Sequence, residues 1–131
     1  MWTDVRVLKR MIRDSLYRSY QPQKTLEHWV YVRKGELKHI IPYIYSVDAV
    51  LNSGTPYEIP ILKTVLQDKM PNGEHLKDLR LHGRFDAYIR GIRLQSLLDT
   101  VIGHEQISDV DIYSPLREFI GGSGYDIAHN D

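Results

Sequence analysis

The alternation of apolar and polar residues is clearest between residues 77 and 94. At every second position one series is apolar or small, and it includes Leu79, Leu81, Phe85, Ala87 and Ile89. The series between them is polar and mostly cationic: Arg80, His82, Arg84, Asp86, Tyr88 and Arg90. Successive side chains of a strand point to opposite faces, so the pattern predicts a half-buried antiparallel strand over residues 77–90. The spacing of Leu81, Phe85, Ile89 and Ile92 leaves a helix as the alternative.

Two other stretches have the three- and four-residue spacing of amphipathic helices. Residues 3–20 carry an apolar stripe made of Val5, Leu8, Ile12 and Leu16. We expect this helix to end before Pro22, because proline disfavours the helical conformation in the residue that precedes it. Residues 95–103 predict a second helix, whose apolar face consists of Leu97, Leu98, Val101 and Ile102.

Residues 26–45 have the composition of a β-hairpin. Gly35 and Glu36 fit a two-residue turn with glycine at its first central position. This register places Tyr31 opposite Ile40, an aromatic and β-branched pair of the kind that stabilises strand pairing. In the less regular segments we expect a short helix at 46–52, a helical turn or two at 63–70, and strands at 57–62, 110–113 and 116–120.

These elements predict an α+β fold, in which an antiparallel sheet packs against the N-terminal amphipathic helix and the helix near 95–103. We expect one domain over residues 1–120, followed by a flexible, glycine-rich C-terminal tail over 121–131. The predicted core consists of Leu8, Ile12, Val30, Tyr31, Ile40, Ile41, Phe85, Ile89, Leu97 and Leu98.

Composition narrows the class of protein. The chain has 131 residues, of which 42% are hydrophobic, so it is long enough and apolar enough to form a core. No apolar run approaches the roughly 18 residues of a membrane span, and the first residues lack the apolar segment of a signal peptide. With no cysteine, disulfide and thiol chemistry are excluded. We therefore expect a soluble cytoplasmic protein that does not contact membranes.

Charge is unevenly distributed along the chain although it sums to zero. Residues 1–34 hold eight Lys or Arg and three Asp or Glu (+5), and residues 35–98 hold eight and seven (+1). Residues 99–131 hold one and seven (−6). Opposite charge at the two ends can pair within one chain or between copies. We predict a homo-oligomer, most simply a dimer, with the N-terminal helix and Met11 at its interface.

The cationic face of the predicted strand is the main candidate for ligand binding. It presents Arg80, His82, Arg84, Tyr88 and Arg90. Arginine forms a planar, permanently charged fork that suits phosphate, and arginines interleaved with aromatic residues are typical of sites for single-stranded nucleic acid. Arg6, Arg10 and Arg13 lie at helical spacing and extend the candidate site. The alternative is that both sets are solvated surface charges.

Catalytic and metal-binding motifs are weak. His104, Glu105, Asp109 and Asp111 contain oxygen ligands that Mg²⁺ or Ca²⁺ accept, but such acidic clusters are common in loops, so we expect no metal and no cofactor. No nucleophile elbow or phosphate loop is present. We predict a non-enzymatic protein that binds a phosphate-bearing ligand, either a nucleotide or nucleic acid. The alternative is a protein-interaction or self-assembling module with a possible heterologous partner, and a metal-dependent nuclease is a distant third.

Overall fold

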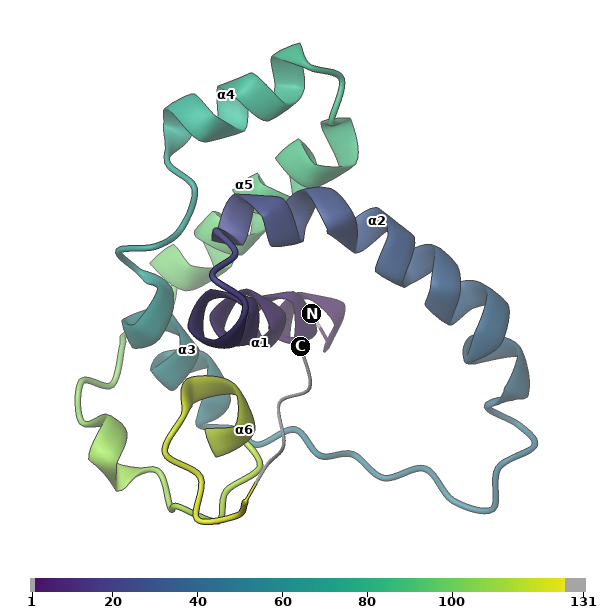
Figure 1. Ribbon diagram of the computed structural model, residues 1–131, viewed down its shortest axis with the longest axis vertical. Helices are drawn as coiled ribbons and strands as arrows, with labels where there is room; N and C mark the ends of the chain where they lie inside the picture. Colours follow the sequence, from purple (N-terminus) through teal and green to yellow (C-terminus); the bar gives the residue numbers. More distant parts are fainter. Residues whose placement is uncertain (1, 127–131) are drawn as a thin grey trace.

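The structure, a computed structural model, describes residues 2–126. Within that range it consists of helices and contains no strand (Figure 1). The predicted α+β fold with an antiparallel sheet is therefore wrong. The helices are α1 (Trp2–Tyr17), α2 (Pro22–His39), η1 (Ile41–Tyr43), α3 (Glu58–Leu66), α4 (Gly73–Leu81), α5 (Phe85–Asp99), η2 (Ile107–Asp109) and α6 (Arg117–Ile120).

Helix α1 lies at the centre of the molecule and confirms the predicted N-terminal helix, although it ends at Tyr17 (Figure 1). It contacts α2, α3 and α6. Contacts on several sides require a wider apolar surface than a surface helix has, and the side chains that supply it are Val5, Val7, Leu8, Met11 and Ile12. Met11 is 0% exposed, so it cannot contact a second copy as we had expected.

Buried ionic groups on α1 each have a partner on another element. The Arg93 Nε of α5 donates to Asp4 at 3.1 Å, and the Lys9 ammonium donates to Glu58 of α3 at 2.7 Å. A buried charge without a partner is strongly destabilising. These pairs therefore fix the positions of α3 and α5 relative to α1.

Helix α2 replaces the predicted hairpin. Pro22 is at its first turn, where the missing N–H of proline does no harm. Its buried residues recur at helical spacing, and they are Pro22, Thr25, Leu26, Trp29 and Glu36. Gly35 lies within the helix and does not form a turn. The β-branched and aromatic residues that suggested strands lie on the other faces of this helix, where Tyr31 is exposed.

Helices α4 and α5 replace the predicted central strand. The Asn72 side chain caps α4 by accepting from the backbone N–H of His75 at 3.0 Å. Gly83 then has φ of +70°, a conformation that glycine adopts without strain, and it separates the two helices. The buried residues of α5 are Ala87, Gly91, Leu94 and Leu98, whose spacing is helical. Helix α5 also includes the first part of the helix predicted at 95–103.

The predicted core is therefore correct only in part. Leu8, Ile12 and Leu98 are buried, and Val30 and Leu97 are half-buried. Tyr31, Ile40, Ile41, Phe85 and Ile89 are exposed. These five residues were predicted to lie on the faces of a sheet. That prediction is wrong because the chain is helical, and not extended, at these positions or directly before them.

The C-terminal segment is held by one arginine. The Arg117 guanidinium donates to the carbonyl oxygens of Ile107 at 3.0 Å and Val110 at 3.1 Å, which closes the loop before α6. The expected strands at 110–113 and 116–120 are absent, and η2 and α6 lie in this region. Of the predicted tail, residues 127–131 lie outside the described part. Within the described part, the Gly124 N–H donates to Ile112 at 2.8 Å.

Candidate functional site

The three arginines predicted on the N-terminal helix line one cavity of about 230 Å³. Arg6, Arg10 and Arg13 share a side of α1 because their spacing of four and three residues matches the helical period. Lys9 lies on the same wall, while Trp29 and Val32 of α2 and Phe119 close the other sides. No carboxylate belongs to the lining. We call this space the cationic cavity.

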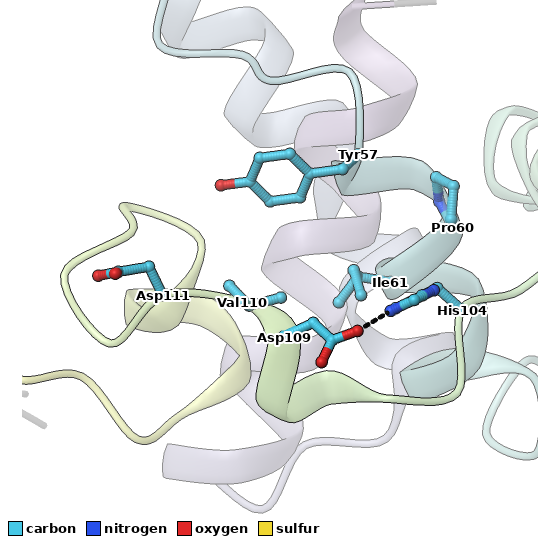
Figure 2. A pocket seen from close by; sticks show the side chains of 7 residues that line it. All are labelled: Tyr57, Pro60, Ile61, His104, Asp109, Val110 and Asp111. Atoms are coloured by element: carbon cyan, nitrogen blue, oxygen red, sulfur yellow. Dashed lines mark hydrogen bonds and ion pairs between the residues drawn. The ribbon is translucent and has the colours of Figure 1, made fainter.

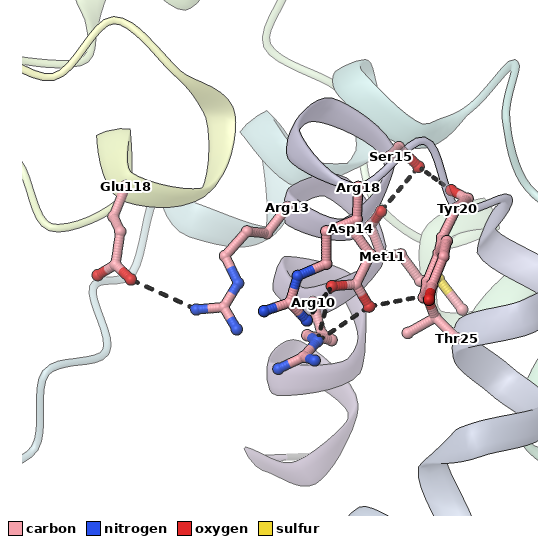
Figure 3. Close-up of polar contacts among 9 residues, drawn as sticks. All are labelled: Arg10, Met11, Arg13, Asp14, Ser15, Arg18, Tyr20, Thr25 and Glu118. Carbon is pink, nitrogen blue, oxygen red and sulfur yellow. Dashed lines mark hydrogen bonds and ion pairs between the residues drawn. The ribbon is translucent and has the colours of Figure 1, made fainter. Parts of the chain in front are cut away.

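Carboxylates behind the wall hold its cationic side chains in place. The Arg10 Nε donates to Asp14 at 2.9 Å, and Asp14 also accepts from the Thr25 hydroxyl at 3.2 Å. Arg13 reaches across to Glu118 of α6, with 3.5 Å between the charged groups (Figure 3). The ion pair of Arg13 with Glu118 is long and partly exposed. It therefore restrains the Arg13 guanidinium less than the other carboxylates restrain their cationic partners.

Glu36 is the carboxylate that positions Arg6. It accepts hydrogen bonds from Arg6 and from Arg33, and it is itself buried. Burial raises the pKa of Glu36, but the hydrogen bonds and charges of the two arginines outweigh it, so the pKa lies below its ordinary value. The carboxylate is therefore ionised at neutral pH and retains Arg6 beside the cavity.

Aromatic rings complete the walls. The Lys9 Nζ lies 5.2 Å from the centre of the Phe119 ring, and the Arg6 Cζ lies 5.8 Å from the centre of the Trp29 ring. These are cation–π distances. Trp29 is 3% exposed and its buried indole N–H has no hydrogen-bond partner.

The second predicted set does not form one face. Arg80 lies on α4 and places its guanidinium 5.8 Å from the ring centre of Tyr88 on α5. His82 follows α4, and its Nδ1 is 3.1 Å from Asp78. Arg84 directly precedes α5. The predicted strand that would have aligned these residues is absent. They are instead distributed over α4, α5 and the turn between the two helices.

Arg90 is likewise engaged locally. Its guanidinium is 3.1 Å from Asp86, one helical turn earlier on α5. Such i, i+4 pairs are typical of exposed helix surfaces. The structure therefore brings together the α1 arginines of the predicted site and leaves the set from residues 80–90 dispersed.

A second cavity, of about 450 Å³, lies between α3 and the segment before α6 (Figure 2). Tyr57, Pro60, Ile61 and Val110 give it mostly apolar walls. His104 and Asp109 lie at its edge, and the His104 Nε2 is 2.9 Å from the Asp109 carboxylate. These two groups satisfy each other. Among residues 2–126 no three His, Asp or Glu side chains gather closely enough to hold a metal ion.

Sequence reasoning missed Lys9, Trp29 and Phe119. Lys9 was within reach, because it lies three residues after Arg6 on the same helix. Trp29 was assigned to a strand, although its spacing from Thr25 and Leu26 is helical. Phe119 gave no signal, since only the packing of the C-terminal segment on α1 brings it to the cavity.

No helix in the described part of the chain is both long and apolar enough to cross a membrane. Comparisons of the chain with known protein families, with curated protein sequences and with solved structures found no match.

Proposed function

We propose that the protein binds a phosphate-bearing ligand, a nucleotide or a short single-stranded nucleic acid, in the cationic cavity. The observation that carries this proposal is the composition of the wall: four cationic side chains and two aromatic rings, with no carboxylate among them. A binding role without catalysis is proposed because the lining contains no Ser, Thr, Cys, His, Asp or Glu, and its one lysine, Lys9, is held as an ammonium in an ion pair with Glu58. A cytoplasmic location belongs to the same proposal.

The side chains match the chemistry of phosphate. Guanidinium groups donate two hydrogen bonds in a plane to phosphate oxygens, and an ammonium group supplies a point charge. The half-buried ring of Phe119 offers apolar surface for a base or a sugar.

The shape of the site favours a small ligand over duplex DNA. A cavity of about 230 Å³ admits a phosphate group and part of what it is attached to. Duplex phosphates are instead contacted by cationic side chains on protruding surfaces. The formal net charge of zero also disfavours duplex binding, which depends on a large positive surface.

Calorimetric titration with ATP, AMP and a short oligothymidylate tests the proposal. Arg13→Ala removes the least restrained cation of the wall and should weaken binding by about 1–3 kcal/mol, the range for a charge-assisted hydrogen bond. Arg84→Ala is the matched control, because Arg84 is exposed and lies outside the cavity. It should leave the affinity unchanged.

Two results would contradict the proposal. One is the absence of binding by the wild-type chain to all three probes. The other is an equal loss in Arg13→Ala and Arg84→Ala, which would show that general surface charge, and not the cationic cavity, attracts the ligand.

A further inference from the structure

Exposed apolar side chains are concentrated in residues 37–51, which we call the apolar arm. Nine of the 21 large hydrophobic residues that are exposed in the structure lie in this stretch of 15 residues. They are Leu37, Ile40, Ile41, Tyr43, Ile44, Tyr45, Val47, Val50 and Leu51. Isolated exposed apolar residues are ordinary on protein surfaces, but a contiguous group marks an interaction site.

The arm projects away from the rest of the molecule. Helix α2 packs on α1 and α5, but beyond Trp29 its only buried residue is Glu36. Figure 1 shows the end of α2 and the following chain forming a wide loop that runs away from the central helix before it returns to α3. Every residue of the arm is exposed, so the arm has no core of its own.

The total surface is larger than that of a compact monomer of the same mass. The chain exposes 8834 Å², whereas a compact monomer of 15.3 kDa exposes about 7,100 Å². The surplus is about 1,700 Å², and a stable interface buries about 800 Å² on each partner. The surplus of exposed surface is therefore larger than the area that one interface of ordinary size buries on each partner.

The charge of the apolar arm favours a second copy of the chain as its partner. In a two-fold interface the same patch meets itself, so like charges come together. Lys38 and Asp48 are the only formally charged residues of the arm, and their charges cancel. The other exposed apolar stripe, on α5, holds three large side chains, Phe85, Ile89 and Ile92, which is fewer than the arm provides. We propose that the apolar arm is the interface of a homodimer.

The test is the mass of the particle measured by light scattering and sedimentation, from low to high micromolar concentration. Tyr45→Asp and Leu51→Asp change side chains that are 98% and 90% exposed, so neither should disturb the fold. Ile102→Asp is the matched control, because Ile102 is 91% exposed and lies outside the arm. Circular dichroism verifies that each variant is folded.

Wild-type chain and Ile102→Asp should form dimers. Tyr45→Asp and Leu51→Asp should weaken the dimer by more than about tenfold, because each places two carboxylates in an apolar contact. A wild-type chain that stays monomeric at high micromolar concentration would overturn the proposal. Arm variants that dimerise as strongly as the control would overturn it as well.

A covalent readout avoids the dependence on concentration. The chain has no cysteine, so Tyr45→Cys and Ile102→Cys each introduce a single thiol. Under mild oxidation Tyr45→Cys should give a disulfide-linked dimer and Ile102→Cys should remain largely uncrosslinked. Equal crosslinking of the two variants would show random collision and would contradict an interface at the arm.

Discussion

Glu36 shows how one residue can connect ligand binding with stability. It comes from α2, yet its two hydrogen-bonding arginines come from α1 and from its own helix. A buried carboxylate between two guanidinium groups is stabilised in its ionised form only while both remain near. The same contact orients Arg6 at the cationic cavity.

Stability should therefore decrease in acid partly through Glu36. Its pKa is lower in the folded chain than its ordinary value of 4.5, so folding favours the ionised form. The resulting stabilisation is complete above the pKa of the unfolded chain and is lost as the pH falls through the folded pKa. Urea unfolding between neutral pH and about pH 3 should show a smaller decrease for Glu36→Gln than for wild type.

The comparison is informative because all other carboxylates are present in both proteins. If wild type and Glu36→Gln lose the same free energy of unfolding on acidification, Glu36 does not contribute, and the two arginines do not hold it in solution.

At the scale of elements, residues 77–94 carry two competing patterns. Alternation groups Leu79, Leu81 and Phe85 on one face, whereas the helical period groups Ala87, Leu94 and Leu98. The chain forms helices because the second group completes a contact with α2 and α4. At Gly91 that contact is close, since an added Cβ would lie 2.5 Å from the Leu76 side chain.

Alanine substitution distinguishes the two patterns. Leu94 is 0% exposed, and Leu94→Ala should reduce the free energy of unfolding by about 2–5 kcal/mol. Phe85 is 58% exposed, and Phe85→Ala should reduce it by less than about 1 kcal/mol. Denaturant melts measure both. A larger loss of stability for Phe85→Ala than for Leu94→Ala would contradict the helical packing and favour the predicted strand.

The local pattern of the sequence was sufficient to predict an element where a single hydrophobic period dominated. The stripe of α1 has a single reading, and that helix was predicted almost to its ends. In α2, Leu26 and Trp29 are helical markers, but Tyr31 of the same helix and Ile40 and Ile41, which follow it, add a strand-like signal, and propensity alone does not decide between them. Ile40 and Ile41 belong to the arm, which in the structure forms neither a strand nor part of the core.

The residues of the cationic cavity could likewise be predicted only in part. Arg6, Arg10 and Arg13 were found because they lie on one helix, where spacing determines the shared side. Trp29 and Phe119 belong to segments far away in the sequence, and only the packing of α2 and the C-terminal segment on α1 brings them to the cavity. No local pattern contains that information.

For the whole molecule, the uneven charge is at least partly satisfied within one chain. The acidic C-terminal segment packs on the basic N-terminal helix, and Arg13 pairs with Glu118 (Figure 3). Charge that is neutralised internally contributes little to association between copies. The proposed dimer therefore depends on apolar contact at the arm.

The two proposed interactions should respond differently to salt. Added sodium chloride screens charge and should weaken ATP binding at the cationic cavity. The apolar arm carries no net charge, so the dimer should be insensitive to sodium chloride, and sodium sulfate should strengthen it because that salt favours burial of apolar surface. Titration and sedimentation of wild-type chain at low and high salt measure both responses.

Each response can fail separately. A dimer that dissociates in sodium chloride would indicate that the basic and acidic ends hold the copies together, which contradicts the arm interface but leaves the cavity untouched. ATP binding that is indifferent to salt would contradict the cationic cavity, because four cationic side chains cannot attract a polyphosphate without sensitivity to ionic strength. The arm interface would then stand alone as the functional surface of this chain.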